Sequence, residues 1–364
     1  MDRRILLKYM ALSTLNMPFL LQADSIKKKK HKNLILIELK GGNDGLNTVV
    51  PYNNPLYYKL RPNIALEKSS VLVIDDEVAL HPSLKAIKDM YDKNEVAIVQ
   101  GIGYPFPNRS HFRSIEIWDT ASKSDEYLDD GWLHALNNDN SQDIKGVVLG
   151  GNYGPLSGQT KNIIKIKSIK SFLNQSKHIN GQIVMTGDND SLKHILNTEN
   201  QIIKSANILK KKLSKTKKLS YTFKKSDFSN QMKLATELII NNAQIPFYKL
   251  SLNGFDTHTN QLLKHSNLLK ELSQNIEIMK KNLEKSGQWK DTIIMTYSEF
   301  GRRAGENASK GTDHGTAAPH FIVGGDIKHG IYGEQPSLGK LEKNGDLVYS
   351  TDFRNYYKHV SKSF

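Results

Sequence analysis

Acidic and histidine side chains that can bind a metal ion stand at the ends of predicted strands in this chain. A short apolar run at residues 292–296 predicts a buried strand. Glu299 follows this strand, then a glycine with Arg302 behind it, and His314 comes after a polar segment. Strand, acid, glycine and histidine in this order are typical of a hydrolase site at the carboxyl edge of a parallel sheet.

A second pair of candidate ligands, Asp256 and His258, follows another predicted strand, at residues 245–250. An aspartate and a histidine two residues apart in a loop can face one metal ion, and oxygen and nitrogen ligands occur together in many such sites. The same spacing is also common by chance. The pair therefore supports a metal site only together with other ligands.

A glycine-rich turn after the predicted strand at residues 34–39 carries a further acid, Asp44. The strand is a continuous apolar run bounded by charge and glycine, which is typical of a central parallel strand. Asp44 is then expected at the sheet edge where α/β proteins bind ligands. The alternative is a turn aspartate that caps the next helix, which is the commoner role of Asn-Asp-Gly.

A serine between two arginines, Ser110 between Arg109 and Arg113, follows the predicted strand at residues 95–99. It precedes a predicted helix at residues 112–121. The Ser110 hydroxyl can cap this helix. It can also act as a nucleophile, or contact an anion with help from the helix dipole and the two arginines. The sequence leaves both interpretations open.

The formal net charge of +14 comes mainly from lysine, with 43 lysines against eight arginines. The lysines are spread along the chain without a nucleic-acid signature, so we predict a solvated surface and no specific nucleic-acid partner. The arginine side chain can hold an oxyanion through two parallel hydrogen bonds. Apart from Arg3 and Arg4, every arginine except Arg61 lies in or near a candidate site, at positions 109, 113, 302, 303 and 354. The chain has no cysteine, which excludes disulfides, thiolate ligands and a cysteine nucleophile.

The amino-terminal segment reads as an export signal. Arg3 and Arg4 precede a mildly apolar stretch, residues 5–21, that is too polar and interrupted for a transmembrane helix. The pattern resembles the twin-arginine motif, which predicts the twin-arginine export machinery as a partner and a periplasmic or secreted location. The alternative is an amphipathic helix that stays on the protein. Residues 1–32 are then signal and basic linker, and residues 33–364 form a single domain with a lysine-rich helical section at about 160–225.

Further strands are predicted at residues 71–74 and 147–149, and helices at 80–91, 228–241 and 262–283. With the strands described above, they predict an α/β protein. Six segments in order then resemble the bacterial family called domain of unknown function 1501: GGNDGLNTVVPY, GYPFPNRSHFRS, GFDTHTNQ, YSEFGRR, GTDHGTAAPHFIVGG and TDFR. That family is related more distantly to alkaline phosphatases, sulfatases and cofactor-independent phosphoglycerate mutases. The resemblance implies a three-layer α/β/α sandwich with a largely parallel central sheet and a metal-dependent ester-hydrolase site.

The resemblance also implies roles for individual residues. One or two divalent ions (zinc, manganese or calcium) would be held by Asp44, Asp256, His258, Glu299 and His314. Ser110 would be the nucleophile, and Arg109, Arg113 or Arg302 would hold the anion. The chain departs from the superfamily pattern at Phe300, which stands where a histidine ligand is expected, and in the narrow spacing of Asp256 and His258.

Three hypotheses follow. The first is an exported metal-dependent hydrolase that acts on a small anionic phosphate or sulfate ester. The second is a non-catalytic exported binding or assembly protein with a reduced metal or anion site on the same fold. Phe300 favours the second, and the remaining ligand set favours the first. A polyanion-binding surface protein is the third class, and it rests on net charge alone.

Overall fold

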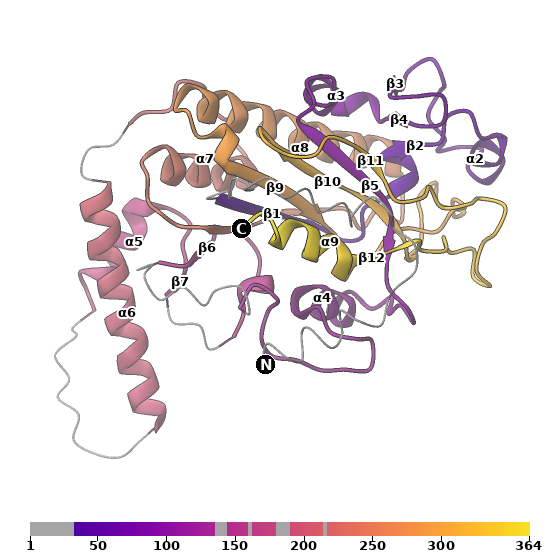
Figure 1. The fold of residues 1–364 in the computed structure, drawn as a ribbon. Helices are drawn as coiled ribbons and strands as arrows, with labels where there is room; N and C mark the ends of the chain where they lie inside the picture. Colours follow the sequence, from indigo (N-terminus) through magenta and orange to yellow (C-terminus); the bar gives the residue numbers. More distant parts are fainter. Residues whose placement is uncertain (1–32, 135–143, 159–161, 180–189, 214–216) are drawn as a thin grey trace.

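The computed structural model describes residues 33–134, 144–158, 162–179, 190–213 and 217–364 (Figure 1). The predicted export signal, residues 1–32, therefore lies outside the described residues. Within the described part of the chain, no helix is both long and apolar enough to cross a membrane.

A nine-stranded sheet runs through the centre of the protein in the order β11-β5-β10-β9-β1-β8-β6-β7, and β12 pairs with β5. In this sheet β1 pairs in parallel with both β8 and β9, whereas β10 is antiparallel to its neighbours β5 and β9. The predicted α/β class with a largely parallel sheet is confirmed. The strands are β1 (Asn33–Lys40), β5 (Val96–Gly103), β6 (Gly146–Val148), β7 (Ile163–Lys165), β8 (Phe247–Asn253), β9 (Thr292–Tyr297), β10 (Ala318–Gly324), β11 (Gly330–Tyr332) and β12 (Thr351–Asp352).

Helices cover both faces of this sheet, which gives three layers (Figure 1). One face packs against α3 (Lys85–Tyr91), α7 (Asp227–Ile240) and α8 (Gln261–Lys285), and the other against α4 (His111–Thr120) and α9 (Phe353–Ser361). Side chains of a strand alternate between the two faces. In β1, Ile35 and Ile37 join the first apolar cluster, and Leu34 and Leu36 join the second. An uninterrupted apolar run in the sequence is therefore what a doubly covered strand requires.

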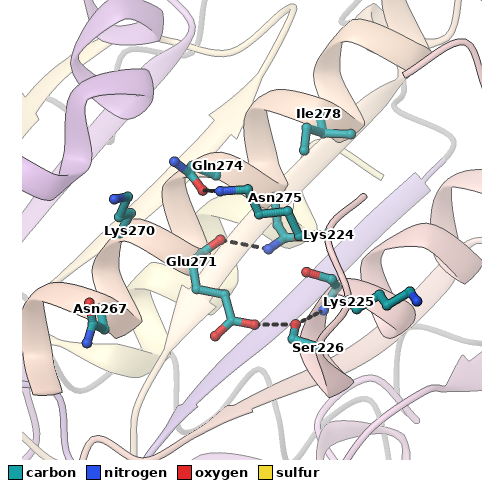
Figure 2. A pocket seen from close by; sticks show the side chains of 10 residues that line it. Lys224, Lys225, Ser226, Asn267, Lys270, Glu271, Gln274, Asn275 and Ile278 are labelled. Carbon is teal, nitrogen blue, oxygen red and sulfur yellow. Dashed lines mark hydrogen bonds between the residues drawn. The ribbon is translucent and has the colours of Figure 1, made fainter. Parts of the chain in front are cut away.

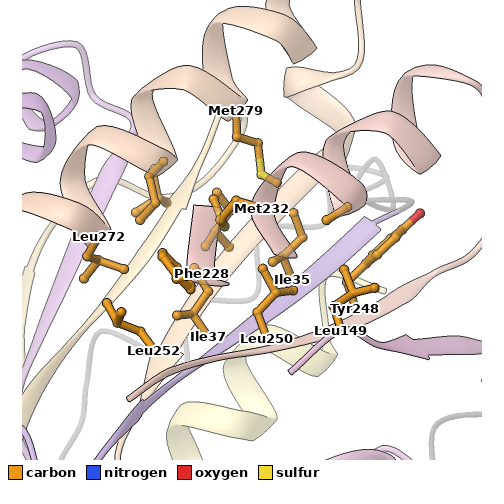
Figure 3. Packing of buried hydrophobic residues seen from close by; sticks show 14 of the residues in the cluster. Ile35, Ile37, Leu149, Phe228, Met232, Tyr248, Leu250, Leu252, Leu272 and Met279 are labelled. Carbon is orange, nitrogen blue, oxygen red and sulfur yellow. The ribbon is translucent and has the colours of Figure 1, made fainter. Parts of the chain in front are cut away.

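Packing on the α7 and α8 face holds the strands in register. Ile37 of β1 and Leu250 of β8 lie beneath Met232 of α7 and Leu272 of α8 (Figure 3), and all four side chains are fully buried. The register pairs Lys40 with the last residue of β8 and places the end of β9 beside β1. The loops that follow β1, β8 and β9 therefore leave the sheet side by side.

Smaller elements complete the fold. The predicted helix at 80–91 begins instead with β4 (Ala79–Leu80) and a 3-10 turn (Pro82–Leu84), because Pro82 starts the helical segment and α3 follows it. A second sheet has the order β2-β4-β3, with β2 (Val49–Val50) and β3 (Leu72–Val73). The remaining helices are α2 (Pro55–Leu60), α5 (Ile169–Ser176) and α6 (Asp190–Lys212), and the last two fall in the lysine-rich section.

A cavity of about 210 Å³ lies between the segment before α7 and the middle of α8 (Figure 2). Several of its polar groups already bind one another, because Ser226 donates to Glu271 at 2.5 Å and Lys224 donates to Gln274 at 3.1 Å. The residues expected from the sequence to bind metal or substrate do not line this cavity. They meet at the carboxyl ends of the strands instead.

Candidate metal centre

Three side chains at the carboxyl edge of the sheet converge as metal ligands would. They are His111, Asp256 and His314, and one ligand atom from each lies within 4.8 Å of the other two. His111 is the first residue of α4, Asp256 follows β8, and His314 precedes β10. Nε2 of His111 lies 3.5 Å from Oδ2 of Asp256, and Nε2 of His314 lies 3.3 Å from Oδ1 of the same aspartate. The tertiary structure thus brings together residues from three distant segments.

The two histidines are oriented by hydrogen bonds at their outer nitrogens. Nδ1 of His111 lies 2.8 Å from the Glu299 carboxylate, and Nδ1 of His314 lies 2.9 Å from the carbonyl oxygen of Arg109. Because these oxygens accept the hydrogen, each Nε2 is left to face Asp256. Burial lowers the pKa of His314, which favours the neutral imidazole that a metal needs, whereas the bond to Glu299 raises the pKa of His111.

His258 extends this group on its other side. Its Nε2 lies 3.0 Å from Nε2 of His314 and 3.0 Å from Oδ1 of Asp256, and its Nδ1 lies 3.3 Å from Asp313. Metal bonds of 2.0–2.1 Å place neighbouring tetrahedral ligands about 3.3 Å apart. The separations of 3.0 Å between His258 and His314, 3.3 Å between His314 and Asp256 and 3.5 Å between His111 and Asp256 lie near that edge length. Nitrogen and oxygen donors of this kind are the type that holds a divalent ion.

Glu299, an expected ligand, lies behind His111 rather than beside the other donors. Its side chain is buried and accepts hydrogen bonds from the Gly41 backbone N–H at 2.8 Å and from Ser298 at 3.3 Å. These contacts and the bond to His111 occupy the carboxylate. Gly41 allows the approach of the loops because its φ is +119°, and an added Cβ would lie 2.3 Å from the Asp256 backbone nitrogen. Glu299 is a positioning residue in this structure.

Replacing Glu299 by glutamine is expected to weaken metal binding by about 10- to 100-fold, because the amide cannot orient His111 as a carboxylate does. Competition with a chromophoric zinc chelator measures the affinity. Gln231, a buried amide beside β8 that touches none of the three ligands, offers a control in Gln231→Leu. Equal affinities for wild type and Glu299→Gln would contradict the assigned role.

Asp44 differs most from its expected role as a metal ligand. Arg61 binds both of its carboxylate oxygens, at 2.6 and 2.9 Å, and the amide of Gln261 donates to one of them. Burial raises the pKa of Asp44, but the charge and hydrogen bond of Arg61, with His265 and Gln261, together hold it below its ordinary value. Both side chains have no exposed surface. Asp44 therefore belongs to a buried ion pair, and its partner is the arginine that the sequence set apart from the candidate sites.

Gln261 connects this ion pair to the candidate metal centre. Its side-chain oxygen accepts hydrogen bonds from Thr257 at 3.0 Å and from Thr312 at 2.7 Å, while its nitrogen donates to Asp44. Thr257 lies between Asp256 and His258 in the chain, and Thr312 stands two residues before His314. One buried amide thus joins the loops that carry the ligands.

Arg302 holds Asp256 instead of an incoming anion. Its guanidinium donates to Asp256 at 2.6 Å, to the carbonyl of Gly42 at 2.7 Å and to that of Thr312 at 2.9 Å, and it is 1% exposed. Burial raises the pKa of Asp256, but the hydrogen bond and charge of Arg302 lower it more, so the carboxylate is anionic near neutral pH. The predicted role of Arg302 as an anion clamp is therefore replaced by a positioning role.

The other two predicted arginines are also engaged within the fold. Arg113 donates to Glu116 at 3.2 Å and to the Ser124 carbonyl at 3.1 Å, and its guanidinium lies 3.8 Å from the ring centre of Tyr127. Arg109 pairs with the buried carboxylate of Asp346. Arg113 therefore ties α4 to the following loop, and Arg109 contributes its carbonyl to the site rather than a free guanidinium.

Ser110 occupies the N-cap position of α4, directly before His111. Its exposed hydroxyl makes no capping hydrogen bond, while its backbone N–H donates to Asn108 at 2.8 Å. The position thus agrees with the cap interpretation, but the side chain does not perform the capping. The nucleophile interpretation stays a prediction.

Phe300, the residue at the position expected for a histidine, packs against two of the ligands. Its ring centre lies 4.9 Å from that of His111 and 4.6 Å from that of His314, and the residue is 2% exposed. His111 supplies an imidazole that the sequence analysis did not select. Its sequence signal was its place one residue after Ser110, at the start of the helix that follows a predicted strand. Proximity to Asp256 could not be read from that position.

These features define an α/β protein with a histidine- and aspartate-lined site at the carboxyl edge of its sheet. The model of a family described as "Protein of unknown function (DUF1501)" matches residues 187–355. This match supports the resemblance over the segment that contains Asp256, His258 and His314, whereas His111 lies outside it. Among curated proteins, no sequence matches the chain.

Several solved structures show a low similarity to this chain. One is a protein in the alkaline phosphatase superfamily from Vibrio parahaemolyticus, with 13% identity and a TM-score of 0.41 over 92% of this chain and 72% of that one. The alkaline phosphatase from the Antarctic bacterium TAB5 has 11% identity and a TM-score of 0.37, covering 93% and 98%. The lipoteichoic acid synthase LtaP from Listeria monocytogenes has 12% identity and a TM-score of 0.37, covering 83% and 68%.

Proposed function

We propose that this protein is an exported, metal-dependent hydrolase of phosphate or sulfate esters. The observation that carries the proposal is the convergence of His111, Asp256 and His314, with each histidine held at Nδ1 by an acceptor behind it. Ordinary surface acids and histidines rarely have such a supporting shell, whereas metal ligands usually do. The twin-arginine-like segment is the support for export.

The residues divide into ligands and supports. His111, Asp256 and His314 would hold one ion, with His258 as the nearest further donor. A divalent ion bound there would lower the pKa of a bound water and neutralise charge on an ester oxygen. Arg302 keeps Asp256 anionic and in place, and Glu299 aims His111. Phe300 excludes water from one side of the two imidazoles.

The ester itself would lie at the start of α4. His111 is the first helical residue, so the positive end of the helix dipole favours an anion beside the ligands. Ser110 offers a hydroxyl that is not used in capping, and we assign it as the candidate nucleophile, with water as the alternative.

A metal assay and a hydrolysis assay together test this proposal. We expect the purified full chain to contain about one equivalent of a divalent ion and to hydrolyse generic aryl phosphate or sulfate esters, with both properties lost in His314→Ala. Ser110→Ala should retain the metal and lose hydrolysis. His178→Ala, at an exposed histidine on another part of the surface, is the control. A folded wild-type protein that binds no divalent ion would refute the proposal.

The second candidate function is a non-catalytic binding or assembly protein. It is favoured by the engagement of Asp44 with Arg61 and of Arg302 with Asp256, which removes a carboxylate and an arginine from any reaction. Stoichiometric metal without hydrolysis of any phosphate or sulfate ester would favour this function over the first.

A further inference from the structure

Arg303, beside the candidate metal centre, has a guanidinium that makes no hydrogen bond to the described residues. Its contacts with carboxylates are 3.6 Å to Asp313 and 3.9 Å to Asp346, both longer than a hydrogen bond. Its side chain is 37% exposed, but Nε is buried without a hydrogen-bond partner. The two terminal nitrogens are therefore the part of the guanidinium that a ligand from solvent would meet.

Other arginines of the described chain are committed to the fold. Arg61, Arg113, Arg302 and Arg354 each donate to backbone carbonyls. Arg109 binds Asp346, and the Asn344 amide oxygen can accept from it at 3.1 and 3.2 Å. Because lysine supplies most of the surface charge, this contrast points to a specific role for the fork of Arg303.

Arg303 lies near the metal ligands but on the far side of Asp313 and His258 from Asp256. Its backbone N–H donates to the Asp313 carbonyl at 3.1 Å, and Arg302 and His314 form a β-bridge next to it. Asp313 contacts Arg303 through one carboxylate oxygen and His258 through the other. A carboxylate and an imidazole thus separate the guanidinium from Asp256. A group held by Arg303 would be distinct from the group held at the metal centre.

We propose that Arg303 binds a second acidic group of the substrate, carried by the alcohol portion of the ester. This inference rests on the proposed hydrolase function and names its substrate class: phosphate or sulfate esters whose alcohol bears a further carboxylate, phosphate or sulfate. A guanidinium pairs with any of these groups through charge-assisted, bidentate hydrogen bonds. Arg109 pairs with Asp346, so this carboxylate is not left to Arg303 alone.

Calorimetric binding of two matched probes to the full chain tests the inference. Phenylphosphonate and para-carboxyphenylphosphonate are not hydrolysed and differ by one carboxylate, and we expect the second to bind about 10-fold tighter to the unchanged protein. Arg303→Met should remove this difference and leave the affinity for phenylphosphonate unchanged. Arg303→Lys should retain part of it, since lysine keeps the charge but not the fork. Lys264→Met removes an equal charge from the start of α8 and should preserve the difference.

Each other outcome has a definite meaning. Equal affinity of the two probes for the unchanged protein would overturn the inference. So would an equal loss for both probes in Arg303→Met, because Arg303 would then act on the ester group itself. Selective binding of the phosphonates without hydrolysis of the aryl esters would reject the hydrolase proposal and leave the acidic-group site intact. Failure of both probes to bind would contradict both proposals.

Discussion

Replacing Arg61 by methionine is expected to lower the free energy of unfolding by about 3–5 kcal/mol, because it leaves the buried Asp44 carboxylate without its partner. Arg61 also donates to the carbonyl of Ala304 at 2.8 Å and to Asn47 at 2.8 Å, so several buried acceptors lose their donor together. Urea unfolding of the wild type and the variant at neutral pH measures the difference.

A double-mutant cycle isolates the ion pair from the lost packing. Asp44→Asn removes the charge, so the variant Arg61→Met/Asp44→Asn should be more stable than Arg61→Met alone. Lys281→Met is the control, because its ion pair with Glu277 is exposed at 46% and 38% and should cost about 1 kcal/mol or less. A loss in Arg61→Met no greater than in this control would contradict the buried ion pair.

The folded protein is also expected to lose stability sharply as the pH falls below about 6.5. Burial lowers the pKa of His81 to about 3, of His265 to about 4 and of His320 to about 3. The unfolded chain takes up protons at the ordinary pKa of about 6.5, so the stability present above that pH is lost as the pH falls toward the folded values. At about pH 5, each of these histidines is expected to have lowered the free energy of unfolding by about 2 kcal/mol relative to neutral pH.

His320 allows one of these contributions to be measured alone. It lies in β10 against Trp118 and Tyr356, and neither ring nitrogen has a hydrogen-bond partner among the described residues. Between about pH 7.5 and pH 5, the free energy of unfolding should therefore decrease in both proteins, and the decrease should be about 2 kcal/mol smaller for His320→Leu than for wild type. Both proteins are treated with a chelator first, so that pH-dependent metal release does not contribute to the difference. His178→Leu, at an exposed position, serves as control. Parallel pH profiles for His320→Leu and wild type would contradict the prediction.

Phe300 illustrates how the two candidate functions relate. A histidine there would have added a donor, and the structure instead packs a phenyl ring against His111 and His314. The centre therefore has fewer donors than the resemblance implies, and a phenyl ring packs against two of those present. The metal and hydrolysis assays decide whether this smaller centre turns over an ester or only binds one.

Local sequence patterns predicted five of the nine strands of the central sheet, namely β1, β5, β6, β8 and β9, but not β7, β10, β11 or β12. Apolar runs such as residues 292–296 can be buried on both faces only in a central strand, so the run predicts β9 within a residue of its observed bounds. The same logic places Asp256, His258 and His314 in loops at the carboxyl edge. The hydrophobic pattern of a strand and the position of the loop after it are set by short segments, so they can be predicted without knowledge of long-range contacts.

Roles within the site depended on tertiary contacts. Nothing near Asp44 in the sequence shows that Arg61, seventeen positions later, would bind both of its oxygens in the interior. Likewise, His111 is a ligand candidate only because α4 brings it to Asp256, and Glu299 is a support only because His111 lies in front of it. The sequence by itself determined which chemical groups reach this edge of the sheet. Which of them face one another was decided by long-range packing, because an ionic or hydrogen-bonded partner is chosen by distance in space and not along the chain.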